Sequence, residues 1–222
     1  MSKETWAAVE RYYGNLLAPD DAALEHALQS SEAAGLPRIQ ISALQGKLLH
    51  LLARMVAARN ILEIGTLAGY SAIWMARALP EDGQLITLEA NEKHAEIAQD
   101  NFVRAGIAGK IELRFGKALD TLPQIAAQGR GPFDLVFIDA NRSNLPEYFV
   151  WSLGLARRGS VIVVDNVVRE GGVLNVESSD ADIQGIRRFA EMAAAEKRVS
   201  STVIQTVGSK NYDGFAILLV TA

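Results

Sequence analysis

The sequence predicts an α/β fold in which a mostly parallel β-sheet carries helices on both faces and further helices precede it. After Asn60, short apolar runs alternate with helical segments. Strands that are apolar throughout and are separated by helices are typical of a parallel sheet covered on both faces. The last two apolar runs are joined by a connection too short to hold a helix, which predicts an antiparallel pair at the end of the chain.

The first 58 residues are predicted to form the preceding helices. Thr5–Leu17 and Asp20–Ala34 carry apolar residues at three- and four-residue spacings, as amphipathic helices do. Ser42 is a candidate N-cap for a third helix that runs to about Ala58. These helices are therefore expected to form an N-terminal addition to the sheet.

Residues 59–222 are expected to form the α/β core of a single domain that spans residues 1–222. The predicted parallel strands are Ile61–Ile64, Gln84–Leu88, Ile111–Phe115, Phe133–Ile138 and Val161–Val164. Helices are expected to begin near Ser71, Glu92 and Leu119. The final antiparallel pair is predicted at Thr202–Thr206 and Phe215–Val220, joined by a loop that contains Asn211, Asp213 and Gly214.

Composition excludes several classes of protein. The formal net charge of −4 argues against a protein that binds nucleic acid mainly through charge. The chain has no cysteine, which excludes a disulfide, a thiolate metal site and a cysteine nucleophile. The N-terminus lacks the apolar core of a signal peptide, and no apolar run reaches the roughly 18 residues of a membrane span. A cytoplasmic protein that does not associate with membranes is expected.

The turn after the first predicted strand is a candidate cofactor site. Gly65 and Gly69 let the backbone bend and let a ligand approach closely. Their spacing differs from the glycine fingerprint of dinucleotide-binding proteins, and Glu63 at the strand end would repel a pyrophosphate. A carboxylate there would instead attract a cationic amino group, which favours S-adenosylmethionine (SAM) over NAD. The alternative is a tight strand-to-helix turn without a ligand.

The next two strand ends carry further candidate cofactor residues. Glu89 follows Glu63 by 26 positions and ends the second strand, where its carboxylate could accept hydrogen bonds from ribose hydroxyls. Gly116 and Ala118 follow the third strand and are small enough for an adenine ring to lie beside them. A solvated strand end explains Glu89 and an ordinary turn explains the small residues equally simply.

Two later strand ends predict a metal site. Asp139 follows the fourth strand, and Asp165 and Asn166 follow the fifth. Adjacent strands lie about 4.8 Å apart, so these side chains should converge where α/β sheets bind their ligands. Two carboxylates and an amide oxygen suit Mg²⁺, or another divalent cation such as Ca²⁺ or Mn²⁺. The alternative is that each aspartate caps a helix or forms a turn.

Together these motifs resemble the metal-dependent class I O-methyltransferases, which include the catechol and caffeoyl-coenzyme A O-methyltransferases. The resemblance extends from about Ile39 to Val220. It rests on Gln45-Gly46, Glu63-x-Gly65-Thr66-x-x-Gly69-Tyr70-Ser71, Leu88-Glu89, Gly116-x-Ala118, Ile138-Asp139-Ala140, Asp165-Asn166 and Asp213-Gly214-Phe215.

The resemblance implies a Rossmann-like, seven-stranded sheet with an antiparallel last strand, in a homodimer. It also implies SAM contacts from Ile41, Glu63, Thr66, Ser71, Glu89, Ala118 and Asp139, beside the glycines already singled out. Metal ligation would fall to Asp139, Asp165 and Asn166.

One position departs from the family. A lysine commonly stands three residues after the first metal aspartate and acts there as the base, whereas this chain has Arg142. A guanidinium keeps its proton at any working pH, so Arg142 cannot be a general base. With Asp139 it remains a candidate catalytic residue that orients or neutralises an oxyanion; the alternative is a surface arginine. Lys210 is a candidate proton acceptor.

The expected function is SAM-dependent, metal-assisted methylation of a hydroxyl group in a catechol-like small molecule. Three alternatives stay open. The acceptor could be a hydroxylated wobble uridine in transfer RNA, the chain could bind SAM without catalysis, or it could be an NAD-dependent oxidoreductase.

Overall fold

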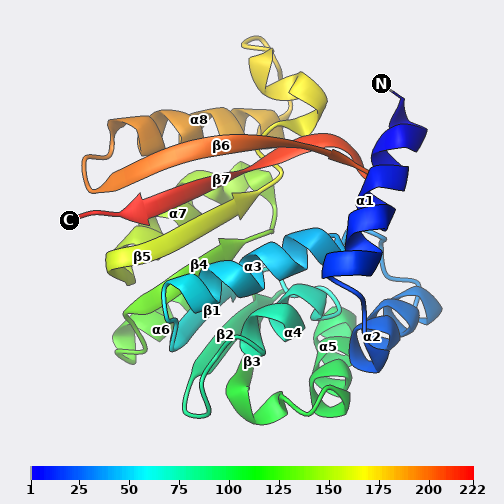
Figure 1. Cartoon of the computed structure of the whole chain (residues 1–222). Coiled ribbons are helices and arrows are strands. Elements are labelled where there is room, and N and C mark those ends of the chain that lie inside the picture. The colour runs from blue at the N-terminus through cyan, green and yellow to red at the C-terminus, as the bar shows by residue number, and fades with distance from the viewer. Residues whose placement is uncertain (1) are drawn as a thin grey trace.

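The computed structural model describes residues 2–222, which contain a seven-stranded sheet (Figure 1). The strands are β1 (Asn60–Ile64), β2 (Gln84–Glu89), β3 (Ile111–Phe115), β4 (Phe133–Ile138), β5 (Ala156–Asp165), β6 (Val199–Gly208) and β7 (Asn211–Val220). Their spatial order is β3-β2-β1-β4-β5-β7-β6, and β7 is antiparallel to both of its neighbours. The predicted α/β fold with a reversed last strand is confirmed.

Helices cover both faces of this sheet. Within the described residues they are α1 (Lys3–Leu17), α2 (Ala22–Ala33), α3 (Ala43–Met55), α4 (Tyr70–Ala76), α5 (Glu92–Arg104), α6 (Ala118–Ala127), α7 (Leu145–Gly154) and α8 (Ala181–Ala195). Short 3₁₀ helices are η1 (Ala108–Lys110), η2 (Arg142–Asn144) and η3 (Arg169–Leu174). α3, α4 and α5 lie on one face, and α6, α7 and α8 lie on the other (Figure 1). No helix in residues 2–222 combines the length and apolarity needed to cross a bilayer.

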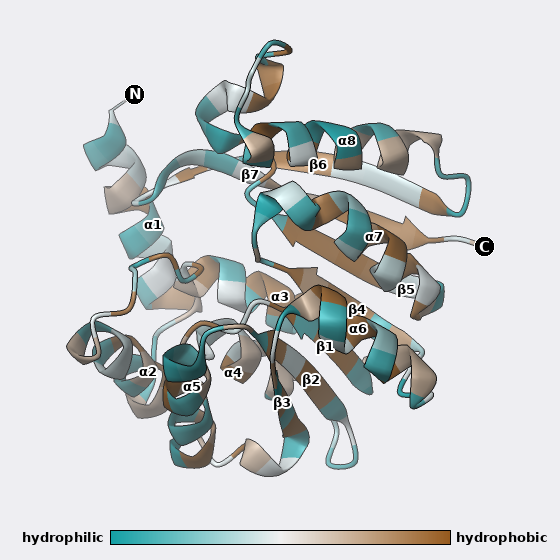
Figure 2. Ribbon diagram, turned by 180° about the vertical axis from the view of Figure 1, so that it is seen from behind, coloured by the Kyte–Doolittle hydropathy of each residue, from teal (hydrophilic) through white to brown (hydrophobic). Residues whose placement is uncertain are grey.

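The central strands bury both of their faces, which explains why their sequences are apolar throughout. Ile61 of β1 packs with the α3–α5 layer, whereas Leu62 and Ile64 pack with the α6–α8 layer. Figure 2 shows the same strands as the most hydrophobic part of the ribbon. Ile138 of β4 pairs with Val164 of β5, so the residues after these two strands leave the sheet at the same level.

The predicted start of α3 is confirmed at Ser42. Its hydroxyl accepts the amide of Gln45, and the Gln45 side chain accepts the amide of Ser42, which is a reciprocal capping box. The helix ends at Met55 rather than near Ala58. α1 lies apart from the main layers, has no buried residue, and packs against β6 and α3 (Figure 1).

The final hairpin is longer than predicted. Asn211, Asp213 and Gly214 were expected in the loop, but all three are paired within β7, and the turn consists of Ser209 and Lys210. The expected loop was wrong because the polar side chain of Asp213 is satisfied by amides from the segment after β5. Such a contact is set by tertiary structure and leaves no signal in the local sequence.

Candidate active site

The turn after β1 brings that strand close to the end of β4. Gly65 has a φ of +102°, and a Cβ atom added there would lie 2.1 Å from the carbonyl oxygen of Asp139. Gly69 has a φ of +83°, and its Cβ would lie 2.3 Å from the ring of Phe102. The left-handed backbone at both positions agrees with the predicted bend. Their closest neighbours, however, are other parts of the chain, so packing alone requires glycine here.

Glu63 is fully buried beneath this turn. Its Oε1 accepts the hydroxyl of Ser71, and its Oε2 accepts the hydroxyl of Thr87 at 2.6 Å. Burial raises the pKa of Glu63 to about 8 against the effect of these two donors, and the negative charges of Asp139 and Glu89 raise it further. A cationic ligand group held nearby would stabilise the ionised carboxylate.

Glu89 is held at the end of β2 by the same turn. Its Oε2 accepts the amide of Leu67 at 2.8 Å and that of Thr66 at 3.3 Å. Its Oε1 accepts the amide of Asn91 at 2.9 Å. A carboxylate accepts about four hydrogen bonds, so Glu89 keeps capacity for a ligand hydroxyl.

A cavity of about 480 Å³ opens at the carboxyl ends of β1, β2 and β4. Its lining includes the predicted cofactor residues Ile41, Gly65, Thr66, Ser71, Glu89, Ala118 and Asp139. Glu63 and Gly69 are not among the lining residues, so the structure places them behind the wall. His94, Tyr148 and Asp182 also line the cavity, although sequence reasoning did not assign them to the cofactor site. They lie on helices, where no local motif distinguishes a cavity residue from a surface one.

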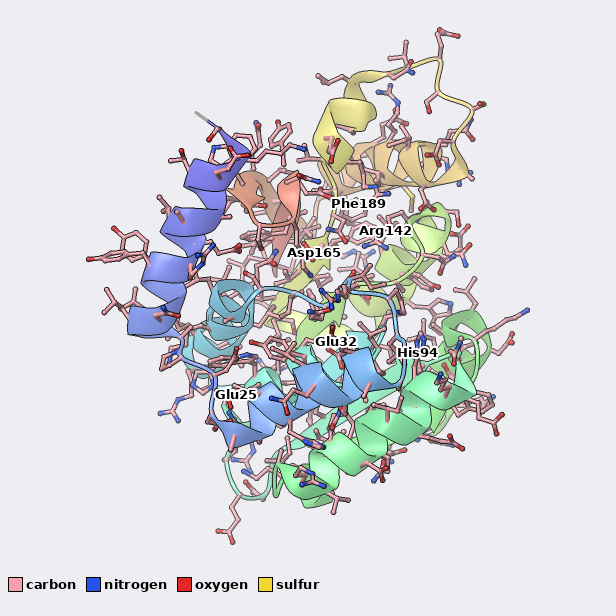
Figure 3. All side chains as sticks on the ribbon, turned by 90° about the vertical axis from the view of Figure 1, so that its right-hand side faces the viewer. Glu25, Glu32, His94, Arg142, Asp165 and Phe189 are labelled. Atoms are coloured by element: carbon pink, nitrogen blue, oxygen red, sulfur yellow. The ribbon has the colours of Figure 1, made fainter. Side chains whose placement is uncertain are left out.

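Arg142 joins the predicted metal ligands. Its Nη2 lies 2.9 Å from Oδ1 of Asp139 and also donates to Oδ1 of Asn166. Asp165 is buried beside them, and Figure 3 shows Arg142 and Asp165 close together in the middle of the molecule. The prediction that Asp139, Asp165 and Asn166 converge agrees with this arrangement. The alternative of a surface arginine is wrong, because only 18% of the Arg142 side chain is exposed.

Burial perturbs both carboxylates of this cluster. It raises the pKa of Asp165 to about 7, and the charge of Asp139 adds to that effect. Burial also raises the pKa of Asp139, although the neighbouring Arg142 opposes the shift. Within residues 2–222 no three His, Cys, Asp or Glu side chains gather as metal ligands, so a site here needs Asn166 as its third ligand. The donor set of two crowded carboxylates and one amide oxygen fits a hard divalent cation.

Asp213 fixes the orientation of Asn166. Asn166 has a φ of +59°, which asparagine tolerates better than most residues, and its Nδ2 donates to Oδ2 of Asp213 at 3.3 Å. Oδ1 of Asp213 accepts the amides of Val168 at 3.0 Å and Arg169 at 2.9 Å. These bonds leave Oδ1 of Asn166 directed at Arg142. Sequence reasoning listed Asp213 in a motif but did not assign this role to it.

A second cavity of about 520 Å³ lies between α1 and the β6–β7 hairpin. α1 contributes Thr5, Trp6, Val9, Glu10 and Tyr13 to its lining. Asp165 and Asn166 line the same cavity, while Ile39 and Ile41 line both cavities. The two cavities therefore adjoin at Ile39 and Ile41, and the carboxylate cluster is divided between them. The contribution of α1 was missed because its sequence shows only an ordinary helical periodicity.

Lys210 also lines the second cavity, at the turn of the hairpin. Although the residue as a whole is exposed, partial burial of its ammonium group lowers the pKa, while the charges of Asp139 and Asp165 oppose that shift. Glu10 of α1 accepts the amide of Ser209 at 2.8 Å and so ties α1 to the same turn. The structure thus places a second cationic side chain in the second cavity, near the carboxylates.

Residues 17–217 match the sequence profile of the O-methyltransferase family. The chain is 50% identical over 220 residues to a catechol O-methyltransferase of Niastella koreensis, an alignment that covers 99% of this chain and 100% of the relative. It is 52% identical over 212 residues to a catechol O-methyltransferase of Mycobacterium tuberculosis, with 96% and 94% covered. The chain belongs to the O-methyltransferase family.

Solved structures agree with this assignment. An O-methyltransferase from Bacillus cereus, solved in complex with S-adenosylhomocysteine (SAH), superimposes on this chain with a TM-score of 0.97 at 54% identity, covering 99% of this chain and 100% of the other. The O-methyltransferase TomG from Streptomyces achromogenes, solved with SAM, gives a TM-score of 0.97 at 51% identity, with 100% of both chains covered. The whole architecture of this O-methyltransferase, including α1, therefore has solved counterparts.

Because the chain is an O-methyltransferase, the position of Arg142 raises the question of which group takes the acceptor proton. The O-methyltransferase has a permanently protonated guanidinium on Asp139 and Asn166, so the proton of an acceptor hydroxyl must go elsewhere. Lys210 is the nearest alternative that sequence reasoning named, and it faces the same carboxylates. Its role as the proton acceptor stays a prediction.

Proposed function

We propose that this O-methyltransferase transfers the methyl group of SAM to a hydroxyl oxygen of a catechol-like small molecule, assisted by a divalent cation. The observation that carries the proposal is that Asp139 lines one cavity and Asp165 lines a second, adjoining cavity. One cavity has the residues expected for SAM, and the other is enclosed by α1. The names of the two curated relatives support a catechol as the acceptor.

SAM fits the first cavity by the chemistry of its walls. Asp139 and the Ser71 hydroxyl, backed by buried Glu63, would receive the cationic amino end of the methionine moiety. Glu89 would accept the ribose hydroxyls, and Ala118 leaves space for the adenine ring. The SAH and SAM complexes of the two structural neighbours support SAM as the cofactor.

Methyl transfer forms one oxygen–carbon bond and breaks one sulfur–carbon bond. The acceptor hydroxyl loses a proton, its oxygen takes the methyl group, and SAH leaves with a neutral sulfur. A divalent cation at Asp139, Asp165 and Asn166 would lower the pKa of the acceptor hydroxyl and fix its position. A catechol suits such a site because two adjacent oxygens can chelate one ion.

The chain itself orients the acceptor. Trp6 and Tyr13 of α1 supply aromatic walls to the second cavity, and Lys210 adds a positive charge near the carboxylates. A developing phenolate would be stabilised by that charge, and holding the oxygen against the methyl carbon supplies much of the rate acceleration. Lys210 would take the proton in its neutral form, which burial favours, directly or through water, and would acquire its positive charge in that step.

The test is a methylation assay with SAM, Mg²⁺ and a panel of catechols, read by mass spectrometry of the products. Asp165→Ala should lower kcat/KM by about a hundredfold or more, because a ligand and its charge are lost. Asp100→Ala removes an exposed aspartate on α5 and should leave the rate unchanged. Full activity in excess chelator would remove the metal from the mechanism. Methylation of transfer RNA with no methylation of catechols would assign the alternative acceptor.

A further inference from the structure

The proposed metal ligands already hold a cation that belongs to the chain. Arg142 Nη2 contacts Oδ1 of Asp139 and Oδ1 of Asn166, which are two of the three proposed ligand side chains. Only 18% of the Arg142 side chain and 20% of the Asp139 side chain are exposed. The contact is therefore a sheltered ion pair between residues three apart in the sequence, and not a transient surface pair.

The backbone of Arg142 is fixed by α8. A Cβ atom added to Gly185 of α8 would lie 2.1 Å from the carbonyl oxygen of Arg142, so this close approach requires glycine. Asp182 at the start of α8 accepts the amide of Ser143 at 3.0 Å. Two contacts from one helix thus hold η2 where the guanidinium reaches the ligands. The position of Arg142 is a consequence of the fold.

A guanidinium and a divalent cation would compete for this cluster. Oδ1 is the only oxygen that the Asn166 side chain offers a metal, and two positive charges a few ångströms apart repel each other strongly in a sheltered site. Arg142 has no hydrogen bond to Asp165, so Asp165 is the proposed ligand that the guanidinium leaves open. Metal binding therefore requires the guanidinium to leave Asp139 and Asn166.

We propose that Arg142 is a built-in competitor for the divalent cation, which occupies two of the ligands until a metal displaces it. This inference rests on the proposed function. It gives the enzyme a weaker affinity for divalent cations than its three oxygen ligands alone would provide. Methyl transfer then requires a higher concentration of divalent cation, because loading the site includes displacing Arg142.

The test measures Mn²⁺ binding directly, from the free Mn²⁺ signal in electron paramagnetic resonance, with SAH present and the full chain. Arg142→Gln should bind Mn²⁺ at least about tenfold more tightly than the unaltered protein, because the competing charge and its contacts are gone. Arg142→Lys keeps the charge on a shorter side chain without the planar fork, so its affinity should lie between the two. Circular dichroism and SAH affinity confirm that each variant is folded.

Arg188→Gln is the matched control. Arg188 of α8 donates to the carbonyl oxygen of Ser143 at 3.4 Å, so it neighbours the same segment without touching the proposed ligands. Its Mn²⁺ affinity should equal that of the unaltered protein. Equal tightening in Arg188→Gln and Arg142→Gln would show a long-range effect of charge and would overturn the inference.

The remaining outcomes separate this inference from the proposed function. If the unaltered protein and Arg142→Gln bind Mn²⁺ with the same affinity, Arg142 is no competitor, while the metal site stands. If neither protein binds Mn²⁺, the metal part of the proposed function fails, and the inference fails with it.

Discussion

Replacing Glu63 with glutamine should make the protein more stable and its cofactor binding weaker. The buried carboxylate has a pKa of about 8, against 4.5 for an ordinary glutamate. Between these two values the folded state holds a proton that the unfolded state releases. The free energy of unfolding therefore falls as pH rises through this range. Glutamine has nearly the same shape and does not titrate, so the Glu63→Gln variant lacks this loss.

The size of the stability difference follows from the pKa shift of Glu63. Each pKa unit corresponds to about 1.4 kcal/mol, so a rise from 4.5 to about 8 corresponds to about 5 kcal/mol at alkaline pH and about 3 kcal/mol at pH 7. The variant has a cost of its own, because one of its amide hydrogens faces the hydroxyl of Ser71 or Thr87, which must turn to accept it. A reoriented hydrogen bond costs about 1 kcal/mol, so a net stabilisation remains at pH 7.

Urea unfolding without cofactor, at about pH 5.5 and pH 8, measures this difference. The difference in the free energy of unfolding between the variant and the unaltered protein should grow by about 3 kcal/mol in favour of the variant from pH 5.5 to pH 8. A difference between the two proteins that is the same at both pH values would refute the reasoning. SAH binding by calorimetry gives the functional half of the prediction: loss of the carboxylate should weaken binding by about tenfold or more, because a cationic amino group loses its counter-charge.

Three further predictions concern the same site. SAM affinity of the unaltered protein should rise between about pH 6 and pH 8, because ionising Glu63 costs less free energy near its pKa, and calorimetry should find no such rise in Glu63→Gln. Gly65→Ala should destabilise the protein by about 3 kcal/mol or more, since its Cβ meets the Asp139 carbonyl oxygen. Gly129→Ala has a positive φ of +65° with no atom within 4 Å, so thermal unfolding should show a loss of only about 1 kcal/mol, and equal losses would contradict the steric argument. Asp213→Ala should lower the free energy of unfolding by about 2–4 kcal/mol and lower kcat, because three backbone amides and the Asn166 side chain lose their acceptor. Asp213→Asn can keep the amide bonds but not the acceptor for Asn166, so it should recover stability more fully than kcat.

The sequence was sufficient to predict the parallel core because its signal is local. Strands buried on both faces are apolar throughout, and the polar residue that follows each one marks the edge where ligands bind. Asp139, Asp165 and Glu89 were found in this way, and the structure places all three on cavity walls. The strands were predicted correctly where one short segment contained the whole signal, and the candidate side chains at their ends stay predictions.

Prediction was weaker where distant segments meet. β6 is an edge strand with a largely exposed surface, so its sequence lacks the apolar run that marks a buried strand, and its length was underestimated. The contacts of Arg142 depend on Gly185 of α8, more than forty residues away in the chain. The wall of the second cavity depends on α1 lying against the hairpin, which no motif in α1 indicates.

Ile41 stands in the segment between α2 and α3 and faces both cavities. In the proposed function this side chain, together with Ile39, lies between the cavity for the methyl donor and the cavity for the acceptor. A larger or smaller residue at position 41 changes the shape of both cavities. Donor affinity and acceptor preference therefore cannot be altered separately at this position. Trp6 and Tyr13 belong to the acceptor side alone, which makes α1 the place to redesign acceptor preference while leaving the donor side untouched.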